Sequence, residues 1–100
     1  MAGKHLVLLG DSVFDNQAYV ARGRAVVYHL RRTLPPSDRV TLLAMDGDGS
    51  QDIPDQLRRL PPDTTHLALS VGGNDVLGCL HAFNAPCRSV SEAFTHLNVL

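Results

Sequence analysis

Largely apolar runs alternate with polar, glycine-rich loops along most of the chain. Three such runs each lead directly into a loop that contains glycine and aspartate: His5–Leu9, Val40–Met45 and Leu67–Val71. Runs that are apolar on both faces are typical of strands in parallel sheets, which are buried from two sides. The pattern therefore predicts three buried parallel strands.

Segments with helical spacing lie between and after these runs. Their apolar positions are Val27, Leu30 and Leu34; Ile53, Leu57 and Leu60; and Val90, Phe94 and Leu97. A pair of prolines ends each of the first two segments, because proline cannot continue a helix. Ser50 or Asp52 is available as the N-cap of the second helix, and Ser89 with Glu92 forms a capping-box pattern before the third.

Strands that alternate with helices predict the α/β class, with a parallel sheet joined by right-handed crossovers. In such a sheet the loops after the carboxyl ends of the strands emerge at one edge, where binding sites form. The three glycine-rich loops are therefore expected to converge. With 100 residues, the chain has the size of one small domain, 1–100.

Composition narrows the classes of partner. Nine Lys and Arg nearly balance ten Asp and Glu, giving a net charge of −1, so no basic surface for nucleic acid or an anionic membrane is expected. No apolar stretch approaches the ~20 residues of a membrane helix, and Leu6–Leu9 is too short for a signal-peptide core. A cytoplasmic protein is the default expectation. Cys79 and Cys87 either pair or stay free, and no metal-ligand cluster emerges, so no metal or cofactor is expected.

Two of the loops carry residues suited to acyl transfer. In Gly10-Asp11-Ser12 the glycine lets the backbone turn sharply after a strand, which presents the serine hydroxyl above the sheet edge. In Gly72-Gly73-Asn74-Asp75 the Asn74 amide is a good donor to a developing oxyanion. The plainer interpretation is that these side chains merely cap turns.

The middle loop, Asp46-Gly47-Asp48-Gly49, offers backbone N–H groups that a ligand can approach closely. It is the weakest signal of the three, because glycine and aspartate also build an ordinary turn between strand and helix.

Together, Gly10-Asp11-Ser12, Gly47 and Gly73-Asn74-Asp75 resemble the first three sequence blocks of the SGNH hydrolases, the GDSL-type esterases and lipases. The resemblance implies a flavodoxin-like, three-layer α/β/α fold that stops after the third strand and the start of the next helix. It implies hydrolysis of a small-molecule ester of the lipid, acetyl-sugar or thioester class through an acyl-enzyme on Ser12. The backbone of Ser12, the backbone of Gly47 and the side chain of Asn74 would be the oxyanion donors. Gly49 is an alternative to Gly47, because Ala44-Met45-Asp46 stands where the family often has an asparagine.

The base that would activate Ser12 is missing from the expected place. The resembled family takes Asp and His from a later Asp-x-x-His block, and the literal match, Asp63 to His66, precedes the third strand and so lies at the opposite end of the sheet, about 15–20 Å away. We reject it as the catalytic pair. His96 falls in the last predicted helix, so His81 is the one histidine that follows the Asn74 loop on the correct edge of the sheet, and it is the less favoured substitute base.

Alternatives to a hydrolase remain. In the first alternative, the loops bind an acyl or sugar ligand without catalysis. In the second, the chain is a degenerate remnant of a hydrolase. A phosphate-handling enzyme is set aside, because Val13 stands where a second aspartate is needed and no Gly-Lys-Ser/Thr sequence ends a loop. The third strand is expected to be a bare sheet edge, which suggests a fragment or a domain that needs a partner segment.

Overall fold

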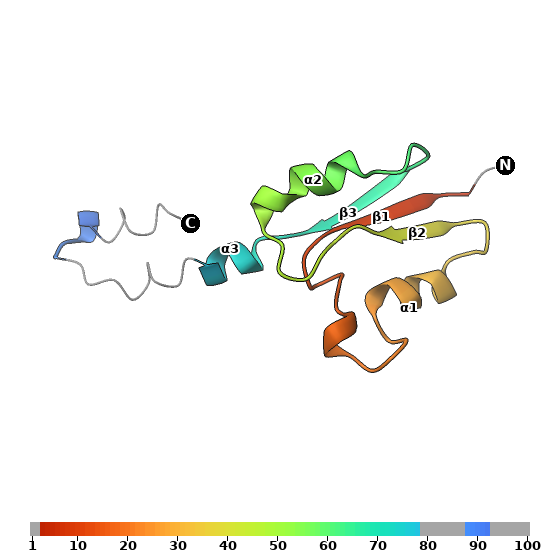
Figure 1. Ribbon diagram of the computed structural model, residues 1–100, viewed down its shortest axis with the longest axis horizontal. Helices are drawn as coiled ribbons and strands as arrows, with labels where there is room; N and C mark the ends of the chain where they lie inside the picture. Colours follow the sequence, from red (N-terminus) through yellow and green to blue (C-terminus); the bar gives the residue numbers. More distant parts are fainter. Residues whose placement is uncertain (1–2, 79–87, 93–100) are drawn as a thin grey trace.

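The computed structural model describes residues 3–78 and 88–92 of the chain. Strands and helices alternate along it, and a short 3-10 helix precedes each of the first two α-helices (Figure 1). In chain order the elements are β1 (His5–Gly10), η1 (Gln17–Tyr19), α1 (Val26–Thr33), β2 (Arg39–Leu42), η2 (Ser50–Asp52), α2 (Ile53–Arg58), β3 (His66–Ser70) and α3 (Gly73–Gly78).

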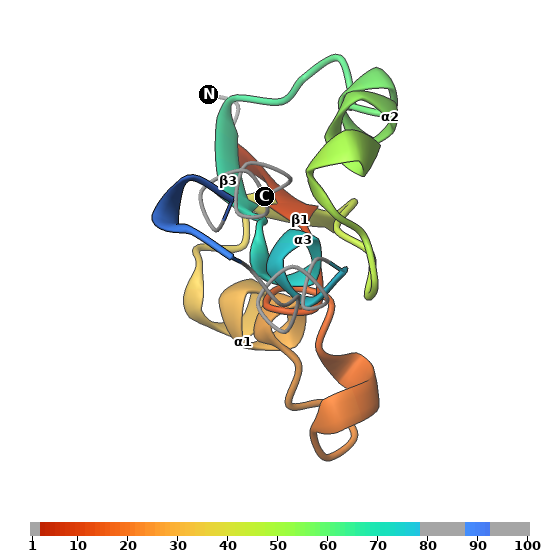
Figure 2. The ribbon, with the colours of Figure 1, turned by 90° about the vertical axis from the view of Figure 1, so that its left-hand side faces the viewer.

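The three strands form one parallel sheet in the order β2-β1-β3, with β1 in the centre. Leu6 of β1 lies opposite Val40 of β2 on one side and His66 of β3 on the other. Helices α1 and α2 cover opposite faces of this sheet (Figure 2). The predicted α/β class and the three-layer arrangement are therefore confirmed.

The apolar core lies between α1 and the sheet. Leu8, Val27, Val40 and Ala25 are buried together, and the half-buried Leu30 and Leu34 pack against them. The helical stripe predicted for this segment is thus the face that α1 turns to the sheet. The helix ends at Thr33, just before the two prolines, as expected from their missing N–H groups.

Strand β2 ends earlier than predicted, at Leu42 rather than Met45. Beyond Leu42 the backbone turns, so that the N–H groups of Leu43 and Ala44 both donate to the carbonyl of Leu8. The regular ladder between β1 and β2 stops there. The N–H of Met45 still donates to the Gly10 carbonyl over 3.1 Å, but the N–H of Gly10 finds its acceptor outside β2, in the side chain of Gln56.

Helix α2 differs from the prediction in which side chain it buries. Leu57 was placed on the buried stripe, but it is 42% exposed, whereas its neighbour Gln56 is completely buried. The reason is that the regular pairing of β2 with β1 ends early. Helix α2 packs beside the N–H of Gly10, which needs a hydrogen-bond acceptor, and Gln56 supplies it.

The loop predicted after the third strand is a short helix instead. Gly72 has a φ of +126°, and helix α3 begins at the next residue, with the N–H of Val76 donating to the Gly72 carbonyl over 3.1 Å. Asn74 and Asp75 therefore lie in the first turn of a helix.

The predicted cap of the last segment is present in part. Ser89 Oγ accepts the N–H of Glu92 over 3.1 Å, and the Glu92 carboxylate accepts the N–H of Arg88 rather than that of Ser89. Phe94 and Leu97, the other apolar positions predicted for this helix, lie outside the described residues.

Strand β3 presents apolar side chains to solvent. In the described part of the chain it pairs with β1 alone, and Leu67 and Leu69 are 52% and 57% exposed. The expectation of a bare apolar edge at this strand is therefore confirmed.

These burial differences predict different costs for two leucines of the same sheet. Leu8→Ala empties a site that is 1% exposed, so the free energy of unfolding is expected to fall by about 2–5 kcal/mol. Leu69→Ala removes a largely solvated side chain and is expected to cost about 0.5 kcal/mol. Urea unfolding followed by circular dichroism measures both. Equal losses would contradict this account of the core.

Candidate active site

The turn after β1 can form only because residue 10 is glycine. Gly10 has a φ of +129°, and a Cβ there would lie 1.8 Å from the carbonyl oxygen of Ser70. The next N–H, that of Asp11, donates to the same carbonyl, and the Asp11 carboxylate accepts the N–H of Val13 over 3.1 Å. Asp11 is buried, and its hydrogen bonds fix the turn that places Ser12 at the edge of the sheet.

Ser12 itself is half-buried, and among the described residues neither its hydroxyl nor its N–H has a hydrogen-bond partner. The turn is instead closed around it, since Phe14 and Asp15 donate their N–H groups to the Asp11 carbonyl. Within the described structure, both polar groups of Ser12 are thus available to a ligand.

The buried carboxamide of Gln56 ties this turn to the middle loop. Its Oε1 accepts the N–H of Gly10 over 2.8 Å, and its Nε2 donates to the Gly10 carbonyl over 2.8 Å. The same Nε2 donates to Oδ2 of Asp48 over 2.9 Å. The sequence analysis did not identify Gln56. The sequence shows only that a polar residue stands one position before Leu57, which was expected to be the buried position.

Asn74 ties the third loop to the middle one. Its Nδ2 donates to the backbone carbonyl of Asp48 over 2.8 Å, which uses one of the two amide hydrogens. The adjacent Asp75 accepts the N–H of Ser50 over 3.0 Å and the Ser50 hydroxyl over 3.2 Å. The loops after β2 and β3 are thereby joined at several points.

The two glycines of the middle loop have different roles. The N–H of Gly49 donates to Oδ2 of Asp52 over 2.9 Å, and Gly49 is buried against Asp75. Gly47 is exposed with a φ of +92°, and among the described residues its N–H has no partner. Of the two candidates considered from sequence, the geometry therefore favours Gly47 as a free donor.

Asp15 and Asn16, to which the sequence assigned no role, also support the edge. Asp15 accepts the N–H of Asp46 over 2.7 Å, and Asn16 accepts the N–H of Val26 over 3.0 Å at the start of α1. Asp46 also accepts the hydroxyl of Tyr19 over 2.7 Å, and this hydrogen bond, with the charge of Asp46, raises the pKa of Tyr19.

The expected convergence of the three loops is confirmed by these contacts. Gly10 is linked through Gln56 to Asp48, and Asp48 is linked to Asn74. Ser12, Gly47 and Asn74 accordingly emerge at one edge of the sheet.

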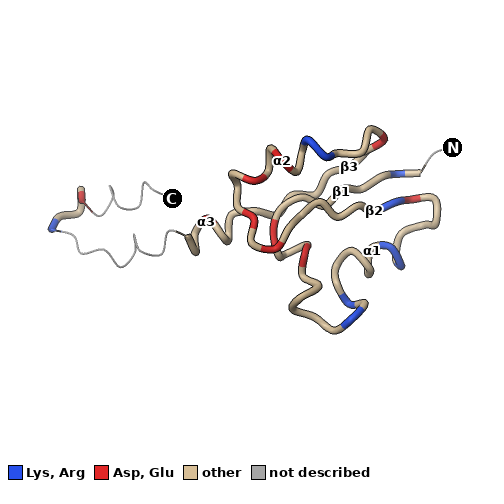
Figure 3. The backbone as a smooth tube through the Cα atoms, in the orientation of Figure 1, with Lys and Arg blue, Asp and Glu red and all other residues tan. Residues whose placement is uncertain are grey.

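The same edge is acidic. Figure 3 shows acidic positions, coloured red on the backbone, in the loops at the carboxyl ends of the strands. The loops 10–17, 44–52 and 71–78 contain no Lys or Arg, and their acidic residues are Asp11, Asp15, Asp46, Asp48, Asp52 and Asp75. Such an edge repels anionic ligands and favours uncharged or cationic ones.

Asp63 and His66 lie at the other end of the sheet, so their rejection as a catalytic pair is confirmed. Asp63 accepts a hydrogen bond from Nδ1 of His5 and forms an ion pair with Arg39 rather than contacting His66, and His66 opens β3 opposite Leu6. His81, the substitute base, lies outside the described residues, as do Cys79 and Cys87.

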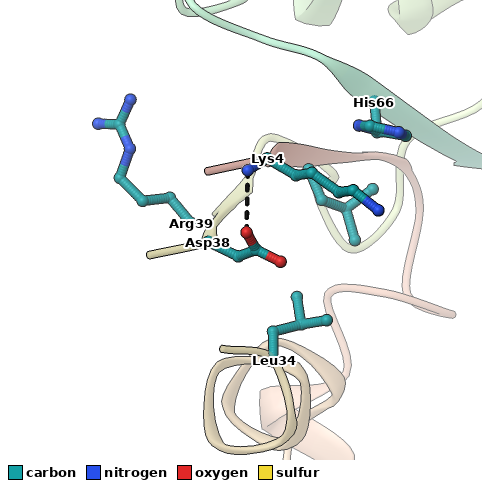
Figure 4. A pocket seen from close by; sticks show the side chains of 6 residues that line it. Lys4, Leu34, Asp38, Arg39 and His66 are labelled. Carbon is teal, nitrogen blue, oxygen red and sulfur yellow. Dashed lines mark hydrogen bonds between the residues drawn. The ribbon is translucent and has the colours of Figure 1, made fainter. Parts of the chain in front are cut away.

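A cavity of 160 Å³ also lies at this amino end, with Leu6 and Leu34 on its walls. Figure 4 shows Lys4, Asp38, Arg39 and His66 around it, with the backbone N–H of Lys4 donating to Asp38 over 2.9 Å. The cavity is remote from Ser12, which lies at the carboxyl end of the strands.

Among residues 3–78 and 88–92, no group of three His, Cys, Asp or Glu side chains could hold a metal ion. No helix in these residues is long and apolar enough to cross a membrane.

Known structures place the fold. No protein-family model and no curated protein matches the chain. The structure of AlinE4, an SGNH-hydrolase family esterase, superposes with a TM-score of 0.63 at 22% identity, covering 99% of this chain and 51% of that one. The chain therefore shares its fold with about half of this esterase. Two variants of AlinE4, with an aspartate or a serine replaced by alanine, match equally at 22% and 21% identity. The chain thus spans about half the length of these SGNH-type structures.

His5 gives the amino end a pH dependence. The ring is 4% exposed, with Nδ1 2.9 Å from Asp63 and Nε2 2.7 Å from the Thr41 hydroxyl, contacts that suit a neutral imidazole protonated on Nδ1. Burial, followed by the charge of Arg39, lowers the pKa of His5 below its ordinary value.

Because the folded state resists protonation of His5, the unfolded chain takes up the proton first as the pH falls through about 6.5. We expect the free energy of unfolding to be retained above that pH and to decline below it. Urea unfolding at about pH 7.5 and about pH 5.5 measures the decline. His5→Gln should flatten it, and His29→Gln, at an exposed histidine of α1, should not. A decline that persists in His5→Gln would assign it elsewhere.

Proposed function

We propose that this chain carries the nucleophile and the oxyanion donors of an ester hydrolase of the SGNH type. The observation that supports the proposal most strongly is the hydrogen-bonded link from Gly10 through Gln56 and Asp48 to Asn74. It joins the loops that carry the Ser12 hydroxyl and the three proposed donors, which are the N–H groups of Ser12 and Gly47 and the side-chain amide of Asn74. Acyl transfer requires that combination, because charge develops on the carbonyl oxygen as the hydroxyl attacks.

In the proposed reaction, Ser12 Oγ forms a bond to the ester carbonyl carbon while its proton passes to a base. The carbonyl oxygen becomes an oxyanion, which the N–H groups of Ser12 and Gly47 and the free amide hydrogen of Asn74 stabilise. The alkoxide leaves with the proton from the base, and water then cleaves the acyl-Ser12 ester by the same route. The described histidines, His5, His29 and His66, belong to other parts of the fold.

The resemblance supplies the expectation for that base, an Asp and a His that follow the segment described by this chain. The esterase match covers about half of the matched protein, so a base from outside these residues is consistent with it. We infer that the chain as given hydrolyses esters weakly.

The acidic edge bears on the substrate. Six aspartates surround the site and its loops carry no cation, so an uncharged ester is favoured over a phosphoester or a carboxylate-bearing one. Small acyl esters of the lipid, acetyl-sugar or thioester class satisfy this requirement.

The test compares hydrolysis of p-nitrophenyl acetate by the wild type and its variants. Ser12→Ala should reduce the rate to that of buffer, and Asn74→Ala should reduce the Ser12-dependent rate about 10²–10³-fold, the usual effect of one lost oxyanion donor. Ser37→Ala, at an exposed serine beyond α1, is the matched control and should leave the rate unchanged. Equal rates for wild type and Ser12→Ala would remove Ser12 from the mechanism.

A second candidate is binding of an acyl or sugar ligand without turnover, which the absence of a described histidine at this edge favours. Binding that survives Ser12→Ala, with no Ser12-dependent hydrolysis, would select this alternative.

A further inference from the structure

We propose that Gln56 is a positioning residue that sets the Ser12 turn against the oxyanion loops. The proposal rests on the ester hydrolysis proposed above, and it assigns Gln56 no contact with the substrate. Its basis is a single buried carboxamide whose hydrogen bonds join two loops on the reacting side of the sheet.

The position of Gln56 follows from the shape of the sheet. Strand β2 ends its pairing with β1 at Leu42, two residues before β1 itself ends at Gly10. Gln56 then supplies the acceptor to the Gly10 N–H that a continued strand would have supplied, and its Nε2 shares the Gly10 carbonyl with the N–H of Met45, which donates over 3.1 Å. The side chain therefore replaces one missing backbone hydrogen bond of the ladder.

Only a carboxamide satisfies all the groups around it. Gln56 is 0% exposed, and both Nε2 hydrogens and Oε1 are engaged. A glutamate would place a second carboxylate against Asp48 and lose the donors. A methionine would leave the buried Gly10 N–H without an acceptor and remove the donor to Asp48, while the Gly10 carbonyl would keep only the N–H of Met45. No buried side-chain nitrogen or oxygen in the described residues lacks a partner, so the arrangement is fully satisfied.

The link continues to the oxyanion side. Gln56 holds the Asp48 carboxylate, and the carbonyl of the same residue accepts the Asn74 amide over 2.8 Å. Gly47 immediately precedes Asp48 in the chain. A displacement of Asp48 would therefore move both proposed oxyanion donors relative to Ser12.

Catalysis is sensitive to such displacements. Misplacing reacting groups by about 1 Å costs about 10²-fold in rate, even when the change is remote from the chemistry. Because Gln56 acts on geometry and not on substrate contacts, its loss should lower kcat and leave KM nearly unchanged.

The first measurement follows backbone and side-chain amide signals by NMR in Gln56→Met. The Gly10 amide should exchange with solvent at least tenfold faster, and the Asn74 side-chain amide signals should shift although Asn74 does not touch Gln56. Val27→Ala, which weakens the α1 core on the other face, is the stability control and should leave both signals in place. Unchanged Asn74 signals in Gln56→Met would overturn the proposed link.

The second measurement is Ser12-dependent hydrolysis of p-nitrophenyl acetate. Gln56→Met should lower kcat about 10²-fold with KM within about twofold, whereas Val27→Ala should keep kcat at temperatures where it is folded. Asp48→Ala should also lower kcat, and the double variant should lose less than the product of the two single losses, because the residues act through one link. Multiplying losses, or a kcat retained in folded Gln56→Met, would show a purely structural role.

The two proposals fail in distinguishable ways. Wild type and Ser12→Ala with equal hydrolysis would refute the ester hydrolase while the NMR measurement still decides on the link. A Ser12-dependent rate with unmoved Asn74 signals would refute the role of Gln56 alone.

Discussion

The carboxyl edge of this sheet depends on how the peptide group of Gly10 is satisfied. Parallel strands must separate where loops begin, and buried N–H and C=O groups left behind cost free energy unless they find other partners. Here the regular pairing of β2 with β1 ends at Leu42, and the Gln56 carboxamide accepts the Gly10 N–H and shares the Gly10 carbonyl with the N–H of Met45. The same side chain reaches Asp48, so a local requirement of the sheet becomes a link between loops.

That link explains why the acidic loops can lie close together. Three of the carboxylates accept hydrogen bonds, which offsets the repulsion between neighbouring negative charges. The donors are the Gln56 side chain to Asp48, the Gly49 N–H to Asp52 and the Ser50 N–H to Asp75. The polar groups of Ser12 and the N–H of Gly47 are left without partners among the described residues. The edge is thus organised by carboxylates while its free groups are mainly donors, which suits an uncharged ligand that develops negative charge.

Sequence patterns were sufficient for the sheet and insufficient for its edge. The runs at His5–Leu9 and Leu67–Val71 lie within one residue of β1 and β3, because continuous apolar character is typical of parallel strands. The burial predicted for all three strands is confirmed for β1 and wrong for β3, whose other edge is unpaired in the described part of the chain, so that Leu67 and Leu69 are exposed. Gln56 was missed because the periodicity argument assumes that a helix buries its apolar side. Helix α2 instead buries an amide side chain that accepts a hydrogen bond from the backbone N–H of Gly10 in β1. The contacts of Asp15 and Asn16 are side chain to backbone across 31 and 10 residues, which no local pattern encodes. The Asp63 to His66 match shows the converse, since its sequence fits the motif and its place in the sheet does not.

The central claim is that Ser12, Gly47 and Asn74 serve one reacting carbonyl group. A crystal structure of the chain after reaction with a small alkyl fluorophosphonate tests it most directly, because the tetrahedral phosphorus adduct reproduces the geometry of the acyl-transfer intermediate. The account predicts phosphorus bonded to Ser12 Oγ, with one phosphoryl oxygen about 3 Å from the N–H groups of Ser12 and Gly47 and from Nδ2 of Asn74. An adduct on another residue, or an oxygen directed away from Asn74 into solvent, would contradict it.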